Sequence, residues 1–430
     1  MSTNRVAITG MAINTPLGDT LETFLAGLLA GTSGITQWRA FDSSGIYSKI
    51  GGDLTGYDVA AKVADLADRL DPSAHKRLRK LIVRAPWSTQ LSVLVAADAW
   101  CDAGLVDAGL DPAKVGVVVA GHNINSHYHD QNREVFREEP DYVDGMYALR
   151  SLDTDHAGSV SDVLAAKGPI FTVGGACASG NIALRCAVDE VRHHGAEAVL
   201  VVGAVLDVAP VDVHAMALMG AISFTSFNDC PELASRPYDA RREGFVPSHG
   251  AAVLVVENLE SALARGATVR AEVLGVAANA DGNHLPEPSQ DGQVAAMRRA
   301  LECAGIAPED VDYVNAHATS TPRGDLSELR AIKEVFGPHA SNLVINAPKS
   351  MLGHTCWSAP TVESVAAILQ MNAGRLHPSI NIDELDAEVD LDVCRHGAEK
   401  QIRHVMKNSF GFGGINCVSI FRGWDGDHDI

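Results

Sequence analysis

The sequence lacks long apolar runs and paired cysteine motifs. Its longest apolar stretches, such as residues 198–206, fall well short of the ~18 residues that a membrane-spanning helix needs. The eight cysteines form no C-x-x-C pair, which indicates reduced thiols and no disulfide framework. The first residues, MSTNRVAITG, lack the charged and apolar regions of a secretory leader. We therefore expect a cytoplasmic protein with no membrane partner.

Positive charge is also scarce. The 54 acidic residues outnumber the 34 lysines and arginines, which gives a formal net charge of -20 at pH 7. Because nucleic acid binding depends on cationic groups that neutralise phosphates, this balance argues against a nucleic acid partner. An acidic protein partner is still compatible with the composition if it docks on a local basic patch.

The hydrophobic pattern is typical of an α/β protein with two lobes. Short β-branched runs predict buried strands, and longer Ala/Leu-rich stretches predict helices. The strands are expected at 6–8, 115–120, 199–205 and 253–256, and the helices at 88–103, 181–194 and 293–304. Similar strand-to-turn sequences begin at Val6 and Val273 and indicate a repeat, with an N-terminal half at 1–258 and a C-terminal half at 259–430.

Cys177 is the first candidate for chemistry. It follows the strand-like and glycine-containing segment 172–175 and precedes an amphipathic stretch. This arrangement predicts a cysteine at a helix N-terminus, where unpaired N–H groups lower the pKa of a thiol and favour a nucleophilic thiolate. A free cysteine is more often a small buried hydrophobe, and that interpretation is preferred for Cys186, Cys303 and Cys417.

Two histidines lie where a strand or loop meets the next element. His317 ends a strand-like segment before a loop rich in hydroxyl groups, and His354 follows Lys349 in a loop before a helix. A cysteine can accept an acyl group from a thioester, and two neutral imidazoles can stabilise the enolate formed when a malonyl thioester loses carbon dioxide. Backbone N–H groups near Cys177 and in the 411–413 turn are expected to form a second oxyanion site. This chemistry needs no metal.

Two other motifs carry weaker hypotheses. The segment 122–130 holds His122, His127, His129 and Asp130, but its spacing matches no common metal site and it has no cysteine partner. The segment 411–416 begins like a dinucleotide-binding fingerprint, yet it lacks the last glycine and no βαβ unit follows it. We therefore expect neither a metal nor a nucleotide cofactor.

The motifs and their order resemble those of the β-ketoacyl-acyl carrier protein synthases of the elongating type, in the thiolase superfamily. The matching segments are the cysteine turn together with residues 8–11, 15–18, 236–240, 243–246, 317–325, 349–354 and 408–416. The resemblance covers essentially the whole chain. It implies a thiolase-like duplicated αβαβα five-layer fold, a homodimer, and substrates carried on the phosphopantetheine of an acyl carrier protein.

The resemblance also implies a role for each polar position. Cys177 is then the acylated nucleophile, and His317 with His354 forms the decarboxylation pair. The other implied roles are a supporting polar network at Lys349 and Glu363, contacts to the phosphopantetheine arm at Thr319 and Thr321, and a gate and oxyanion position at Phe412. All these positions carry the residue types that the family pattern requires.

Three segments depart from the family pattern. Ser248-His249 stands where the family commonly has Gly-Glu, and Trp357–Pro360 stands where it commonly has Gly-Ala-Ala-Gly. Pro286, in the segment 283–286, stands where a hydroxyl often faces the substrate arm. The departures surround the pocket and leave the Cys/His/His set intact. They indicate a specialised enzyme of polyketide or other secondary metabolism.

The leading hypothesis is decarboxylative condensation of malonyl-carrier with an acyl group on Cys177, in polyketide biosynthesis. One alternative is a stand-alone malonyl-carrier decarboxylase that supplies acetyl-carrier to a polyketide β-branching cassette. Another is a non-catalytic subunit of a heterodimer, which the intact cysteine disfavours. A biosynthetic thiolase is disfavoured further, because it uses a second catalytic cysteine in place of the second histidine.

Overall fold

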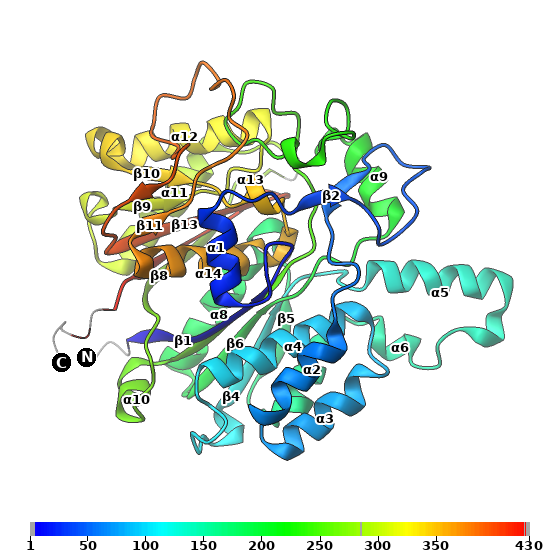
Figure 1. Cartoon of the computed structure of the whole chain (residues 1–430). Coiled ribbons are helices and arrows are strands. Elements are labelled where there is room, and N and C mark those ends of the chain that lie inside the picture. The colour runs from blue at the N-terminus through cyan, green and yellow to red at the C-terminus, as the bar shows by residue number, and fades with distance from the viewer. Residues whose placement is uncertain (1–4, 284–285, 425, 427–430) are drawn as a thin grey trace.

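The computed structural model describes residues 5–283, 286–424 and 426. Its main feature is a ten-stranded mixed sheet (Figure 1). The N-terminal half contributes β1 (Val6–Asn14), β4 (Val115–Ala120), β5 (Ile170–Val173), β6 (Ala198–Gly203) and β7 (Ala251–Asn258). The C-terminal half contributes β8 (Ala271–Ala280), β9 (Tyr313–Asn315), β10 (Val344–Asn346), β13 (His404–Gly411) and β14 (Ile415–Arg422). Most of these strands are buried along their length, as expected for a sheet covered on both faces.

The two halves have the same strand order. From their junction outward, the N-terminal half runs β1-β7-β6-β4-β5 and the C-terminal half runs β8-β14-β13-β9-β10. In each half the last strand of the chain, β7 or β14, is antiparallel to both neighbours, whereas the outer three strands are parallel. The antiparallel pairs Ala7/Glu272 and Ile8/Ala271 join the halves through β1 and β8. The repeat suggested by the similar segments at Val6 and Val273 is therefore present in the topology.

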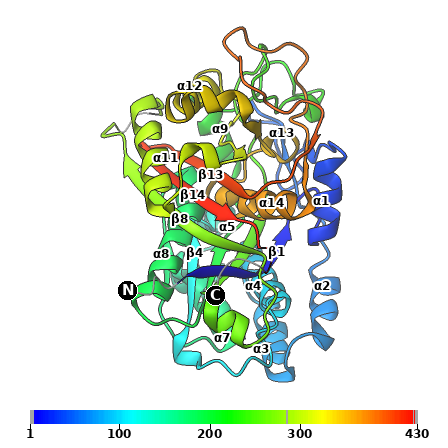
Figure 2. The same ribbon diagram turned by 90° about the vertical axis from the view of Figure 1, so that its left-hand side faces the viewer.

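Helices and sheets alternate in five layers (Figure 2). The central layer holds α8 (Ser179–His193) and α14 (Ala359–Ala373), each of which contacts strands of both halves. The outer layers hold α4 (Trp87–Asp102) and α7 (Thr154–Leu164) on the N-terminal half, and α11 (Gln290–Ala304) and α12 (Pro322–Phe336) on the C-terminal half. Almost every side chain of α14 is buried, as expected for a helix between two sheets.

Shorter elements surround this framework. They are α1 (Leu21–Leu29), α2 (Val59–Asp65), α3 (Pro72–Ile82), α5 (Ser126–Glu138), α6 (Tyr147–Arg150), α9 (Pro210–Leu218), α10 (Leu259–Ala264), α13 (Lys349–Leu352) and the two-stranded sheets β2 (Ile35–Gln37) with β3 (Ile50–Gly52) and β11 (Arg375–Leu376) with β12 (Ala398–Glu399). Figure 1 shows α5 projecting from the body of the molecule. No helix in the described ranges is long and apolar enough to span a lipid bilayer.

Candidate active site

Cys177 lies in a tight turn between β5 and α8. The 3-10 turn Ala176–Ala178 carries the cysteine, and Ala176 before it has a left-handed φ of 47°. The end of β13 approaches this turn closely at Gly411, where a Cβ atom would lie 2.7 Å from the Gly175 carbonyl oxygen and 3.1 Å from the Cys177 nitrogen. Glycine is therefore required at position 411 for the C-terminal half to reach the cysteine.

The thiol of Cys177 differs from the sequence-based expectation. Burial raises its pKa to about 11, although the Lys349 cation and the backbone N–H groups of Phe412 and Cys177 act in the opposite direction. The expected lowering of the pKa is therefore wrong, because removal of the thiol from water outweighs the favourable dipoles. At neutral pH the resting enzyme holds a protonated thiol, and the attack on a thioester requires a nearby base.

The loop after β9 places His317 beside the cysteine. The carboxylate of Glu328, in α12, accepts hydrogen bonds of 2.8 Å from the backbone N–H groups of both His317 and Ala318. The Lys349 ammonium donates a 2.6 Å hydrogen bond to the His317 carbonyl oxygen. The His317 ring is buried, and its Nδ1 atom has no hydrogen-bond partner among the described residues. Among the described residues, therefore, no hydrogen bond to Nδ1 fixes the tautomer of His317.

The second imidazole has a defined tautomer. The backbone N–H of Cys356 donates a 3.2 Å hydrogen bond to His354 Nδ1. Nδ1 is therefore the unprotonated nitrogen, and Nε2 carries the hydrogen in the neutral ring. Nε2 is buried and has no partner in the part of the chain that the structure describes. His354 thus presents an unused N–H donor in the site.

A buried charged triad lies behind the two histidines. The Glu363 carboxylate, on α14, forms ion pairs with Lys349 from α13 and with Lys407 from β13. Burial lowers the pKa of Lys407 to about 8. Burial also lowers the pKa of His317 and His354 well below 6.5, and the nearby Lys349 and Lys407 cations add to this effect. Both imidazoles are therefore neutral at physiological pH.

The structure brings the three predicted reactive groups together. One ligand-capable atom each from Cys177, His317 and His354 lies within 4.8 Å of the others. The set combines a protonated thiol with two neutral imidazoles, which suits it to proton transfer and hydrogen bonding. The segment His122–Asp130 enters α5 and takes no part in this cluster.

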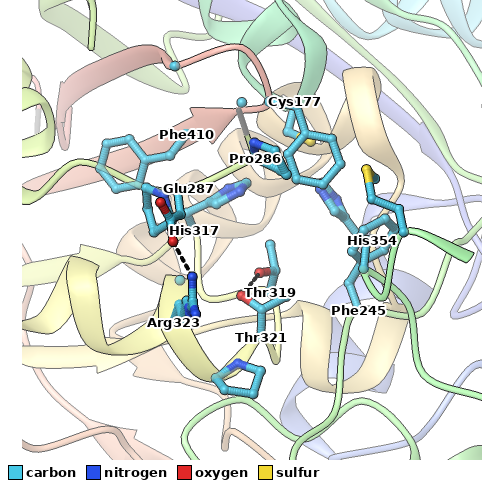
Figure 3. A pocket seen from close by; sticks show the side chains of 18 of the residues that line it. Cys177, Phe245, Pro286, Glu287, His317, Thr319, Thr321, Arg323, His354 and Phe410 are labelled. Carbon is cyan, nitrogen blue, oxygen red and sulfur yellow. Dashed lines mark hydrogen bonds and ion pairs between the residues drawn. The ribbon is translucent and has the colours of Figure 1, made fainter. Parts of the chain in front are cut away.

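All three groups line one cavity of about 630 Å³ (Figure 3). Thr319 and Thr321 also line it, and their hydroxyl oxygens lie 3.0 Å apart. Phe412 lines the cavity and is 39% exposed, and its ring centroid lies 6.4 Å from that of Phe245. The structure therefore gathers the predicted arm-binding and gate positions around the reactive groups.

Family models match most of the chain. Residues 3–262 match the β-ketoacyl synthase N-terminal domain, and residues 270–383 match the β-ketoacyl synthase C-terminal domain. This chain belongs to the β-ketoacyl synthase family. It is therefore an enzyme of the acyltransferase class, and the resemblance recognised in its motifs is confirmed.

Named relatives of this β-ketoacyl synthase cover nearly its full length. The 3-oxoacyl-[acyl-carrier-protein] synthase 2 of Coxiella burnetii is 36% identical over 97% of this chain and 98% of the relative. The polyketide biosynthesis malonyl-ACP decarboxylase PksF of Bacillus subtilis is 33% identical over 96% of this chain and 95% of the relative.

Solved structures confirm the predicted thiolase-like α/β fold of this β-ketoacyl synthase. A ketosynthase in the complex "AntDE:AntF (apo): type II PKS acyl-carrier protein in complex with its ketosynthase bound to the hexaketide" superposes with a TM-score of 0.85 at 26% identity. That superposition covers 99% of this chain and 100% of the other.

Most of the residues that depart from the family pattern do not line the cavity of this β-ketoacyl synthase. His249 packs between Trp38 and Trp87, with ring centroids 5.1 and 4.9 Å away. Trp357 packs against His122 at 5.2 Å, on the three-residue turn 356–358, which contacts the turn of Cys177. Pro286 lines the cavity itself, whereas His284 and Leu285 fall outside the described residues.

Sequence reasoning missed several residues of the β-ketoacyl synthase site. Lys407 was not singled out. It is the one lysine in the strand 404–411, whose other residues are apolar or uncharged, and this position could have indicated a functional residue. Glu328 follows the matching segment 317–325 and received no role, because its contact with the backbone at His317 depends on how α12 packs. Phe245, which packs edge-on against His354 at 5.2 Å, lies in the matching segment 243–246 but was given no role.

Acid should destabilise this β-ketoacyl synthase. Burial lowers the pKa of His156, His249 and His377 to about 4. Below about pH 6.5 the unfolded chain binds protons at these positions that the folded chain excludes, so stability falls as pH drops toward 4. The expected loss is roughly 2 kcal/mol for each histidine by pH 5, measurable by denaturant unfolding from pH 7 to pH 5.

A matched pair of variants isolates this effect. His377→Gln removes one buried imidazole. The free energy of unfolding should therefore fall less steeply between pH 7 and pH 5 than it does in the wild type. His396→Gln changes an exposed histidine and should leave the decline as it is in the wild type. An equally steep decline in the wild type and in His377→Gln would contradict the assignment of a neutral buried imidazole at this position.

Proposed function

We propose that this chain is a β-ketoacyl-acyl carrier protein synthase that condenses malonyl-carrier with an acyl group on Cys177, in polyketide biosynthesis. The observation that carries the proposal is the approach of Cys177, His317 and His354 to within 4.8 Å in a common cavity. The intact thiol supplies acyl transfer, and the neutral imidazoles supply enolate stabilisation. Neither step requires a metal or a redox cofactor.

The first half-reaction is acyl transfer to the thiol. His317 has a free tautomer and accepts the Cys177 proton as sulfur attacks the acyl-carrier thioester. The N–H groups of Cys177 and Phe412, which act on the thiol, then stabilise the tetrahedral oxyanion. Collapse expels the carrier thiolate, which takes the proton back from His317. The products are acyl-Cys177, free carrier thiol and a neutral imidazole.

The second half-reaction is decarboxylation and condensation. The malonyl thioester oxygen accepts a hydrogen bond from His354 Nε2–H, and His317 is close enough to donate a second. The carboxylate leaves as carbon dioxide, and its bonding electrons form the enolate. The enolate carbon attacks the acyl carbonyl, Cys177 leaves as a thiolate, and one proton from solvent restores the thiol. The carrier then holds a β-ketoacyl group.

Decarboxylation without condensation is the second candidate function. The Bacillus subtilis relative named as a malonyl-ACP decarboxylase shares nearly the full length of this chain. The two functions are separated by incubation of the enzyme with malonyl-carrier, with and without an acyl-carrier, followed by mass analysis of the carriers. We expect a β-ketoacyl product when both are present. Acetyl-carrier as the sole product with every acyl donor would overturn the proposal of condensation.

The polyketide assignment and the carrier partner rest on two relatives. One is the decarboxylase whose name places it in polyketide biosynthesis, and the other is the ketosynthase solved with its type II acyl carrier protein. An assay with carriers from a fatty acid pathway and from a polyketide cluster tests the assignment. Equal or greater turnover with the fatty acid carrier would contradict it.

We also expect a homodimer. β5 ends the ten-stranded sheet and pairs only with β4 among the described strands, and its Ile170 is 40% exposed. The projecting segment around α5 and α6 exposes Phe136 (61%) and Tyr142 (76%). Unpaired edges and exposed apolar groups favour association with a second chain. Light scattering should give about twice the chain mass of 45.4 kDa, and a monomer would contradict the expectation.

A further inference from the structure

An ion pair lies at the edge of the catalytic cavity. Arg323, in the first turn of α12, pairs with Glu287 from the segment that precedes α11 (Figure 3). Both residues line the cavity, as does Thr321 two positions before Arg323. The side chains of Arg323 and Glu287 are 76% and 58% exposed, respectively. The pair therefore lies at the solvent side of the cavity, whose catalytic groups are buried.

Arg323 stands out by its charge. The described residues that line the cavity include the carboxylates of Glu243, Asp281 and Glu287, whereas Arg323 supplies the one lysine or arginine cation among them. Glu243 accepts hydrogen bonds from Ser223 Oγ at 2.7 Å and from backbone N–H groups. Asp281 accepts a 2.6 Å hydrogen bond from Asn416 Nδ2. Among the charged side chains of the described residues that line the cavity, Arg323 is therefore the one that attracts an anion.

We propose that Arg323 binds the phosphodiester of the phosphopantetheine arm, and that Glu287 holds its side chain at the mouth until the arm arrives. This inference rests on the proposed function, which requires a carrier-bound substrate. A guanidinium can offer two parallel N–H donors to a phosphate. An exposed ion pair is weak enough to be exchanged for such a ligand.

The order of the residues along the cavity fits the order of the groups along the arm. Thr319 and Thr321 line the cavity nearer to His317 along the chain, and Arg323 follows them on the solvent side. The N-terminus of the 15-residue helix α12 adds positive potential next to its guanidinium. The thioester end would then lie at Cys177 while the phosphate stays at the exposed mouth.

Two compounds that differ only in the phosphate test this assignment directly. Phosphopantetheine and pantetheine are titrated into the whole enzyme by calorimetry, which needs no catalysis. The wild type should bind phosphopantetheine about tenfold more tightly than pantetheine, and Arg323→Ala should abolish the difference. Glu287→Gln should increase it, because the competing carboxylate is removed. Arg298→Ala, which breaks an exposed ion pair with Glu334 on another surface, is the control and should have no effect.

The outcomes separate this site from the proposed function. A preference for the phosphate that survives in Arg323→Ala, or equal binding of both compounds by the wild type, would overturn the assignment. Turnover of acyl- and malonyl-pantetheine thioesters by Arg323→Ala at wild-type rates would show that the condensation machinery works without the arginine. Failure of the wild type to condense either type of substrate would instead refute the proposed function and leave the binding result to decide the role of Arg323.

Discussion

Cys177→Ala is expected to abolish β-ketoacyl formation, with a loss on the order of 10⁴-fold or more, because the nucleophile that holds the acyl group is removed. Decarboxylation of malonyl-carrier should continue, since His317 and His354 remain in place and their pKa values are set mainly by burial. Mass analysis of the carrier after incubation with acyl- and malonyl-carrier measures both products. Acetyl-carrier should appear without any β-ketoacyl-carrier.

A second cysteine variant serves as the control for this result. Cys303 is exposed on α11, so Cys303→Ala removes a thiol without changing the site. It should condense at the wild-type rate. Condensation that persists in Cys177→Ala would show that another group carries the acyl chain, and it would refute the assigned nucleophile.

His354→Ala should lower decarboxylation by about 10²- to 10³-fold, the usual cost of losing one preorganised oxyanion donor. The bond from the Cys356 N–H fixes the hydrogen on Nε2, so the ring is held as a donor before substrate binds. His354→Gln keeps a side-chain N–H and should recover part of the rate. Release of carbon dioxide from labelled malonyl-carrier, in the absence of an acyl donor, measures this step alone.

The control for the histidine experiment is another buried imidazole. His377 is buried and also has a lowered pKa, but it does not line the catalytic cavity. His377→Gln should decarboxylate as the wild type does at neutral pH. A wild-type rate of carbon dioxide release from His354→Ala would show that the enolate is stabilised elsewhere.

The triad of Lys349, Glu363 and Lys407 adds to the effect of burial, which is the main reason that the imidazoles stay neutral. A single carboxylate lies between two buried ammonium groups, so the cluster retains positive character beside both histidine rings. Protonation of a ring would add another cation in a region of low dielectric constant. The triad also joins α13, α14 and β13. The charges that act on the protonation of His317 and His354 therefore also hold these three elements together.

The sequence predicted the strands and the reactive residues more reliably than the electrostatics. The strand at 115–120 and the cysteine turn are local patterns, and both lie where they were expected. The pKa of Cys177 was predicted in the wrong direction, because the burial that raises it depends on how the two halves of the chain pack, including the close approach of Gly411. The neighbouring residues in the sequence predict that Cys177 lies at the start of a helix. They do not predict how far the folded chain removes its thiol from water.

The charged network was difficult to predict for a related reason. Lys349 and Glu363 were assigned from motif resemblance, but Lys407 joins them only because β13 passes beside α14. The tautomer of His354 depends on one backbone N–H, that of Cys356, and on the left-handed φ of 51° at that residue. Side-chain identity alone does not determine either feature.

The most direct test of this account is the location of the acyl group on the enzyme. The wild-type chain is incubated with acyl-carrier in the absence of malonyl-carrier, digested and analysed by mass spectrometry. The account predicts one acyl group, on the peptide that contains Cys177, and its loss when malonyl-carrier is added. An unmodified Cys177 peptide, or an acyl group on another cysteine such as the buried Cys356, would contradict it.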